Sequence, residues 1–346
     1  MTHITPSAEK AKASSPSLLA GIPELLPGLA LTAAIATAAV ITRNLTGWAA
    51  LSPLILSIIL GMATRNLFTV SATLESGIAF SLRRLLRLGI VLLGLQVTVG
   101  QVLSLGGAGL AMVALTLAVT FVAIRAAGRA LGVERELVDL IAAGTSVCGA
   151  SAVIATNTVV RGRQEHVAYA IACVTLFGCL SMFTYPLLTA PLSLDARAYG
   201  LWSGATIHEV AQVVAASFQA GDAAGTFGTI SKLARVAMLA PLVMVLAVAV
   251  RARQGGASKA SAPMPWFVLG FIAMMLVNSA FDIPRDVNAT LALANTFLLS
   301  MALAAMGLQT DIRKLKAEGW RPLALGAFGW LFISAFGFAM LRLFGF

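Results

Sequence analysis

The stretch GTSVCGASAVIATN, residues 144–157, decides how the fold of this sequence is interpreted. It lies within an apolar segment, 139–160, in which Gly144 and Gly149 weaken any helix. A helix that restarts in the middle of a membrane presents free backbone N–H groups and the positive end of its dipole. The stretch therefore predicts a broken or re-entrant membrane helix with an anion-binding site at the break.

Polar side chains accompany these glycines, namely Thr145, Ser146, Cys148 and Ser151. Hydroxyl donors are what a dehydrated oxyanion requires, so the stretch from Gly144 to Ser151 supplies candidate substrate ligands. The alternative is close helix packing, because small residues at positions i and i+4 let two backbones approach. Packing alone does not require three hydroxyls and a thiol in so short a stretch, which favours a binding site.

A second apolar segment, 200–221 (GLWSGATIHEVAQVVAASFQAG), is interrupted in the same way and supplies the candidates Gly204, Thr206, His208, Glu209 and Gln212. A charged carboxylate inside a membrane is costly, so Glu209 is a functional candidate by default. An imidazole beside it favours a proton-coupling role for His208 and Glu209. The alternative is that Glu209 is the structural partner of a basic residue. A zinc-protease helix is excluded, since Gln212 stands where that motif needs its second histidine.

Two basic residues, Lys232 and Arg235, lie inside the apolar stretch TISKLARVAMLAPL. They are three residues apart and therefore face the same side of a helix. We expect them either to attract an anion or to neutralise Glu209. The alternative is that both side chains extend to the membrane interface about one turn away.

Composition places these segments in a membrane protein. Of the 346 residues, 59% are apolar and 11% are charged, with a mean hydropathy of +0.90. Soluble domains are about half apolar and about 25% charged, and a helix needs roughly 20 apolar residues to cross a bilayer. The composition excludes a soluble enzyme, a disulfide scaffold and a disordered chain, and a β-barrel is excluded because its strands alternate with a period of two.

We therefore expect an all-α polytopic membrane protein with about nine full spans plus two interrupted or re-entrant segments, or up to about eleven spans if both segments cross. The expected spans are 25–42, 50–63, 85–104, 107–124, 167–190, 226–250, 265–281, 287–309 and 322–342. Residues 1–22 are predicted to be a disordered tail, followed by a single transmembrane domain, 23–346.

The net charge of +10 reflects orientation in the membrane. Basic clusters such as Arg83, Arg84 and Arg87 border apolar helices, which favours the positive-inside rule over nucleic-acid binding. Placing all such clusters on one side puts the N-terminus in the cytoplasm. The three cysteines lie inside apolar segments and predict no disulfide framework.

An internal repeat is visible in the tripeptide Gly-Leu-Gln, which occurs at 94–96 and again at 307–309. The units around 50–124 and 265–342 run in opposite directions in the topology derived from charge. Inverted repeats with interrupted helices are typical of secondary transporters. The two interrupted segments, however, lie much closer together in the sequence, at Gly144 and Gly204. Either one half of the chain is permuted or one of the correspondences is accidental.

Three motifs in this order, GTSVCGASAVIATN, SGATIHEVAQVVAAS and SKLARVAMLAP, resemble the YeiH-type family of bacterial inner-membrane proteins. Members of this family have been labelled conserved hypothetical proteins and also sulfate exporters. The resemblance covers essentially everything after the tail. It implies membership of the cation/proton antiporter and anion transporter superfamily, with inverted repeats, crossed or re-entrant broken helices and an elevator-like movement of a core bundle against a scaffold that is often dimeric.

These observations predict a secondary transporter that exports a small inorganic or sulfur-containing anion, such as sulfate, across the bacterial inner membrane. The two interrupted segments would form a site at the midplane, His208 and Glu209 would handle a proton, and Lys232 with Arg235 would set the local potential. No cofactor, metal or catalytic residue is expected. The resemblance allows a homodimer, and a proton or a sodium ion is the coupling ion that we expect.

Three alternatives stay open. One is a sodium- or proton-coupled carrier of a small organic anion, and another is a passive channel. The third is an intramembrane serine hydrolase that uses Ser146 or Ser151 with His208, although the stretch lacks the second glycine of a nucleophile elbow.

Overall fold

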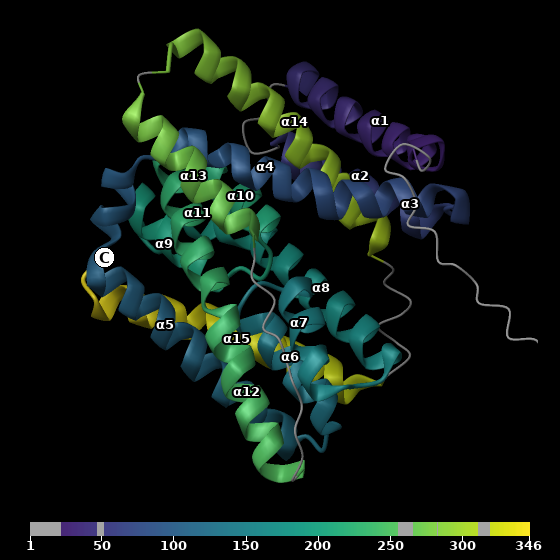
Figure 1. Cartoon of the computed structure of the whole chain (residues 1–346), viewed down its shortest axis with the longest axis vertical. Coiled ribbons are helices and arrows are strands. Elements are labelled where there is room, and N and C mark those ends of the chain that lie inside the picture. The colour runs from purple at the N-terminus through teal and green to yellow at the C-terminus, as the bar shows by residue number, and fades with distance from the viewer. Residues whose placement is uncertain (1–21, 47–51, 255–265, 282, 311–318) are drawn as a thin grey trace, which may run out of the picture.

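A computed structural model describes residues 22–46, 52–254, 266–281, 283–310 and 319–346, and every regular element in these ranges is helical (Figure 1). Among the described residues, six helical segments are long and apolar enough to cross a membrane, namely Pro23–Thr46, Val99–Ala130, Gln164–Leu188, Asp222–Val250, Asp286–Gln309 and Trp320–Leu343. The prediction of an all-helical membrane protein is confirmed at this level. The predicted tail lies outside the described residues, apart from Ile22, which begins the first helix.

The helices form two groups that pack mainly within themselves. We call the first group the hairpin bundle, and it consists of α1 (Ile22–Thr46), α2 (Pro53–Leu67), α3 (Ala72–Phe80), the π-helical turn η1 (Ser81–Leu85), α4 (Leu86–Leu93), the 3₁₀ turn η2 (Gly94–Gln96), α13 (Trp266–Ala280) and α14 (Arg285–Gln309). Segments far apart in the sequence meet here, because α14 packs along α2 and α13 packs along α4 and η2. Figure 1 shows α1, α2, α3 and α14 together at one side of the molecule.

We call the second group the broken-helix bundle. It consists of α5 (Val99–Ala130), α6 (Arg135–Ser146), α7 (Ala150–Val160), α8 (Gln164–Leu188), α9 (Ala196–Thr206), α10 (Val210–Ser217), the 3₁₀ turn η3 (Phe218–Ala220), α11 (Asp222–Ala237), α12 (Leu239–Gln254) and α15 (Trp320–Leu343). Within it, α11 packs along α9, and α5 packs along both α6 and α15. Both interrupted segments predicted from the sequence belong to this bundle.

Two glycines allow helices of the hairpin bundle to touch backbone to backbone. A Cβ on Gly307 of α14 would strike the carbonyl oxygen of Ile58 in α2, and a Cβ on Gly94 would strike the carbonyl oxygen of Phe271 in α13. Small residues permit this close approach between membrane helices. Ile58 and Phe271 are separated by the same offset in the sequence as Gly94 and Gly307, so the same contact occurs twice, each time between the two units.

The offset from Gly94 to Gly307, which we call the long offset, also relates the bounds of several helices. It carries Pro53–Leu67 onto Trp266–Ala280, and it carries the helical stretch that starts at Ala72 and ends at Gln96 onto α14. It also carries Gly106, where α5 is kinked with a φ of 64°, onto Gly319, which precedes α15 with a φ of 83°. The long offset therefore relates helix bounds and positive-φ glycines as well as the repeated tripeptide.

One predicted span, 85–104, is wrong in its bounds. The helical stretch starts at Ala72 and ends at Gln96, and α5 begins at Val99, where the side chains of Thr98 and Gln101 cap it. Charged residues were taken as loop residues in the prediction, whereas η1 and α4 contain three arginines. The predicted span 226–250 is divided at Met238 into α11 and α12, and the other predicted spans overlap single helices.

Candidate functional site

Both segments that the sequence marks as interrupted are broken helices. In the first, α6 ends at Ser146 and α7 begins at Ala150, so residues 147–149 form the first break. In the second, α9 ends at Thr206 and α10 begins at Val210, so residues 207–209 form the second break. Each break leaves the carbonyls of one helix end and the N–H groups of the next helix start without helical partners.

Two buried cations from α11 satisfy the carbonyls at these breaks. The Lys232 ammonium donates to the carbonyl oxygens of Val147 and Ile207, each at 2.8 Å, and also to that of His208. Arg235 donates to the carbonyl oxygens of Ala205 at 2.6 Å and Thr145 at 3.0 Å, and to that of Val147. Positive charge at the C-terminal ends of α6 and α9 is also favourable for their helix dipoles. Both side chains are fully buried, so the structure holds the two breaks together through α11.

Glu209 carries negative charge to the opposite kind of helix end. Its Oε1 accepts a hydrogen bond of 2.6 Å from the backbone N–H of Ala150, the first residue of α7. Gly149 makes room for this contact, since a Cβ there would overlap the Glu209 carboxylate and the residue has a φ of 67°. The backbone N–H of Glu209 in turn donates to Gln212 Oε1 at 3.0 Å. A carboxylate from the second break therefore caps the helix that follows the first.

A cavity of about 310 Å³ lies beside this cap, between the two bundles. The broken-helix bundle contributes Cys148, Ala150, Ser151, Ile154, Ala168, Ile171, Ala172, Thr175, Glu209 and Val210. The hairpin bundle contributes Leu82, Arg83, Leu86, Arg87, Ile90, Phe267, Met306 and Gln309, and Thr310 follows directly after α14. Glu209 is the acidic residue among these lining residues and is only 6% exposed. The cavity thus combines hydroxyl, amide and charged groups with apolar side chains.

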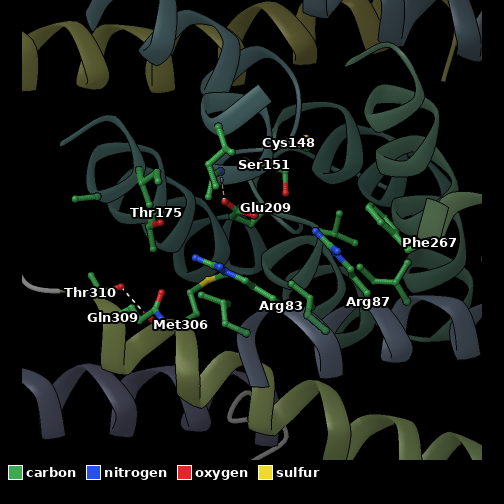
Figure 2. A pocket seen from close by; sticks show the side chains of 18 of the residues that line it. Arg83, Arg87, Cys148, Ser151, Thr175, Glu209, Phe267, Met306, Gln309 and Thr310 are labelled. Carbon is green, nitrogen blue, oxygen red and sulfur yellow. Dashed lines mark hydrogen bonds between the residues drawn. The ribbon is translucent and has the colours of Figure 1, made fainter. Parts of the chain in front are cut away.

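Arg83 and Arg87 face Glu209 and Ser151 across this cavity. Figure 2 shows both side chains reaching from the η1 and α4 stretch into the space toward which Glu209 and Ser151 point. Within the part of the chain that the structure describes, neither guanidinium forms an ion pair with a carboxylate. Two unpaired guanidiniums opposite a helix N-terminus make an environment suited to an anion.

The sequence missed Arg83 and Arg87 as site residues. It assigned them to a cytoplasmic cluster, because arginines at the end of an apolar stretch usually mark its boundary. Their spacing of four residues, on one face of a helix, is the signal that could have suggested a shared function. Thr175 of α8 also lines the cavity without having been predicted, and Gln309 belongs to the repeated tripeptide.

Of the predicted site residues, Cys148, Ser151 and Glu209 line the cavity, and Gly149 lies directly under the Glu209 carboxylate. The remaining predicted residues do not line the cavity. Gly144 and Gly204 are packing positions, where a Cβ would strike Val153 or the carbonyl oxygen of Gly228 in α11. The other seven predicted residues are buried and do not line the cavity, namely Thr145, Ser146, Thr206, His208, Gln212, Lys232 and Arg235.

His208 lies in the second break but does not line the cavity. Among the described residues, neither ring nitrogen of His208 has a hydrogen-bond partner, and the same holds for the hydroxyl of Ser146. A serine hydrolase needs a serine held by a histidine. The described residues contain no hydrogen bond from His208 to Ser146 or to Ser151, so the geometry gives the hydrolase alternative no support.

One group of side chains outside the cavity has a composition suited to a metal ion, namely Glu134, Glu136 and His166. Arg163 already occupies it, because its guanidinium lies 3.1 Å from Glu134 Oε1 and 2.7 Å from His166 Nε2. Two carboxylates beside an arginine and a histidine form an ionic network without any metal. We therefore interpret this group as an ionic network that joins the start of α6 to the start of α8 around the buried His166.

The chain matches the family model described as conserved hypothetical protein 698 over residues 27–326. It is 39% identical over 336 residues to a UPF0324 membrane protein of Pseudomonas aeruginosa, covering 91% of this chain and 94% of that protein. It is 38% identical over 320 residues to the UPF0324 inner membrane protein YeiH of Salmonella typhimurium and to that of Escherichia coli strain K12, covering 89% of this chain and 92% of each. No solved structure matches the chain.

Proposed function

This chain belongs to the family of conserved hypothetical protein 698, the UPF0324 membrane proteins, and we propose that it is a secondary transporter that exports a small anion such as sulfate. The observation that carries the proposal is the cavity between the two bundles. One wall presents the guanidiniums of Arg83 and Arg87, and the other presents the Ser151 hydroxyl and the N-terminus of α7. Charge-assisted hydrogen bonds from such donors are strong and select oxyanions.

The position of the cavity supports alternating access. Its walls belong to two bundles that pack mainly within themselves, so one bundle can move against the other without disrupting either core. Substrate sites of secondary transporters lie where broken helices meet at the repeat interface. In this proposal the broken-helix bundle carries the anion in an elevator-like movement, and the hairpin bundle is the scaffold.

Two sets of spacings support an inverted-repeat fold in which one half is permuted. The long offset relates α2 and the α3–η2 stretch to α13 and α14, as described above. A shorter offset relates the two broken helices, since the shift that carries Ser146 to Thr206 also carries Ala150 to Val210. The broken helix follows its hairpin in the first half and precedes it in the second. Permutation reconciles both spacings, so neither correspondence needs to be accidental.

The relatives and the charge distribution supply the cellular setting of the proposal. YeiH of Salmonella typhimurium is named an inner membrane protein, and we assign this chain to the same membrane. The positive-inside rule places its N-terminus in the cytoplasm. A proton is the coupling ion that we favour, because Glu209 lines the cavity. We also propose a homodimer that forms through the hairpin bundle, because contact between two scaffolds would hold them in place while the broken-helix bundle moves.

The test is anion flux in proteoliposomes that contain the purified protein. Vesicles are loaded with labelled sulfate, then sulfite or taurine, with and without a pH gradient, for the wild type and for Glu209→Gln. We expect saturable flux that responds to the gradient, with loss of that response in the variant. Absence of flux for all three anions would remove the proposed substrate class. Flux that does not saturate would indicate the passive channel instead.

A second candidate, a carrier of a small organic anion, is favoured by one observation. Both walls of the cavity include apolar side chains, among them Leu86, Ile154 and Phe267. Such walls suit the carbon chain of a sulfonate or carboxylate better than they suit sulfate. A preference for taurine over sulfate in the same flux experiment would select this candidate.

A further inference from the structure

We infer that the Glu209 carboxylate is an internal competitor of the transported anion at the N-terminus of α7, so that the anion binds together with a proton. The inference rests on the proposed function, because it concerns the same cavity. It adds whether proton binding strengthens or weakens anion binding. The presence of a carboxylate in the cavity does not by itself decide between the two. The anion and the proton would travel in the same direction.

The first step is the position of the carboxylate. Glu209 Oε1 accepts the N–H of Ala150 at 2.6 Å and lies so close over Gly149 that a Cβ at that position would overlap it. Oxyanions bind at helix N-termini through these same first N–H groups. The side chain of Glu209 therefore holds the place that a transported anion needs on this wall of the cavity.

The second step is the charge around that place. The cations nearest to Glu209 in its own bundle, Lys232 and Arg235, donate their hydrogen bonds to backbone carbonyls of the two breaks. Arg83 and Arg87 face Glu209 from the hairpin bundle across the cavity. An anion that enters between these guanidiniums and α7 meets the negative charge of the buried Glu209 carboxylate at close range, and charges of like sign repel.

The other titratable groups near Glu209 do not replace it in this role. His208 precedes it in the second break but lies outside the cavity lining, and Cys148 of the first break lines the cavity with a thiol group. Cys179 of α8 lies behind Gln212, whose Nε2 contacts its sulfur at 3.4 Å. Glu209 is thus the carboxyl group through which a proton can change the charge of this wall, within the described residues.

The third step is the linkage between the two ligands. A protonated Glu209 is neutral and can leave the Ala150 N–H, so proton binding favours anion binding, and by reciprocity anion binding favours proton binding. A carboxylate that binds a transported cation has the opposite effect, because the cation and the proton compete for it. If a divalent anion moves with one proton, one negative charge still crosses, and an inside-negative membrane potential favours its export.

The experiment measures the binding of labelled sulfate to the purified protein from about pH 5 to about pH 8, with wild type, Glu209→Gln and the control Glu165→Gln. Glu165 is an exposed residue at the start of α8 that does not line the cavity. We expect the sulfate dissociation constant of the wild type and of Glu165→Gln to rise by up to about tenfold for each pH unit once Glu209 is ionised. Glu209→Gln is expected to bind sulfate with an affinity that does not change with pH.

A second measurement tests the inference with the wild-type protein alone, so it does not depend on whether the Glu209→Gln variant folds. Wild-type protein in weak buffer should take up about one proton for each sulfate bound at the upper end of the pH range, as reported by a pH-sensitive dye. Sulfate binding that is equally tight at every pH and takes up no proton would overturn the coupling and leave the proposed function standing. No binding of sulfate, sulfite or taurine at any pH would overturn both.

Discussion

The two breaks, 147–149 and 207–209, solve one structural problem with different residues. Both end a helix inside the bundle, and both expose carbonyls that Lys232 satisfies. Their sequences are Val-Cys-Gly and Ile-His-Glu, and the difference that matters here is at the last position, which is Gly149 in the first break and Glu209 in the second. Gly149 leaves a space beside the first break, and the carboxylate of Glu209 from the second break fills that space. The comparison teaches that the shared part stabilises the two breaks, whereas the differing part is where we propose that the coupling resides.

Breaking the shared part should have the largest effect. Lys232→Met would leave the carbonyl oxygens of Ile207 and His208 without this donor, whereas that of Val147 keeps its bond from Arg235. Each unsatisfied buried carbonyl costs about 1–3 kcal/mol. We expect a marked fall in unfolding temperature in detergent and a reduced yield of folded protein. Arg84→Met, at an exposed arginine of η1 that does not line the cavity, is the control. Equal unfolding temperatures for the two variants would contradict the shared role of Lys232.

Removing the difference between the breaks should have the next largest effect. Gly149→Ala places a Cβ against the Glu209 carboxylate and imposes an unfavourable φ of 67°. We expect a loss of about 1–3 kcal/mol in the free energy of unfolding. The double variant Gly149→Ala with Glu209→Ala should recover the part that is due to the collision, as measured by a double-mutant cycle of unfolding free energies. Strict additivity of the two substitutions would show that these side chains do not meet.

A smaller effect is expected from the two arginines of the hairpin bundle that face the first break across the cavity. Arg83→Ala combined with Arg87→Ala should weaken sulfate binding by about tenfold or more, because two charge-assisted contacts are lost. The pH dependence of the remaining binding should persist, since Glu209 is intact. Arg84→Ala tests whether the effect is merely one of net charge. If it weakened binding as much as the pair, the assignment of Arg83 and Arg87 to the site would be wrong.

The smallest effect is expected from the serines that flank the first break. Ser151 lines the cavity, whereas the hydroxyl of Ser146 is buried without a hydrogen-bond partner among the described residues. Ser151→Ala should therefore weaken sulfate binding by roughly fivefold, which corresponds to about 1 kcal/mol for one hydrogen bond. Ser146→Ala should leave the affinity unchanged. Binding assays on the two variants at one pH compare them directly, and the reverse order would move the site to the other side of the break.

Local chemistry made much of the fold predictable. Glycines and hydroxyls inside apolar segments indicated both broken helices, and the recurring Gly-Leu-Gln marked positions where Gly94 and Gly307 touch a neighbouring backbone. Such features depend on residues that are close in the sequence. The bounds of the span 85–104 were missed because a positive residue indicates a membrane boundary only when its side chain faces the lipid or the interface, and Arg83 and Arg87 face a cavity.

The candidate site was only partly predictable for the same reason. Glu209 stood out by itself, since a carboxylate in an apolar segment requires an explanation. Its partner did not, because the contact from Glu209 to the N–H of Ala150 joins residues 59 positions apart. Lys232 and Arg235 were expected near an anion, yet they are bound to the carbonyls of helix ends. A sequence shows that a buried charge needs a partner but not which of several groups supplies it.

The sequence by itself thus determined that this protein is a helical membrane protein, where its helices break and which family it resembles, because hydrophobicity, glycine content and motif order act locally along the chain. Only the tertiary structure decided which charges meet. It paired Glu209 with the N-terminus of α7 and directed Lys232 to the carbonyls of the two breaks. It also placed Arg83 and Arg87 opposite Ser151. The physical reason is that electrostatic and hydrogen-bond energies depend on distances between side chains from different helices, and packing alone sets those distances.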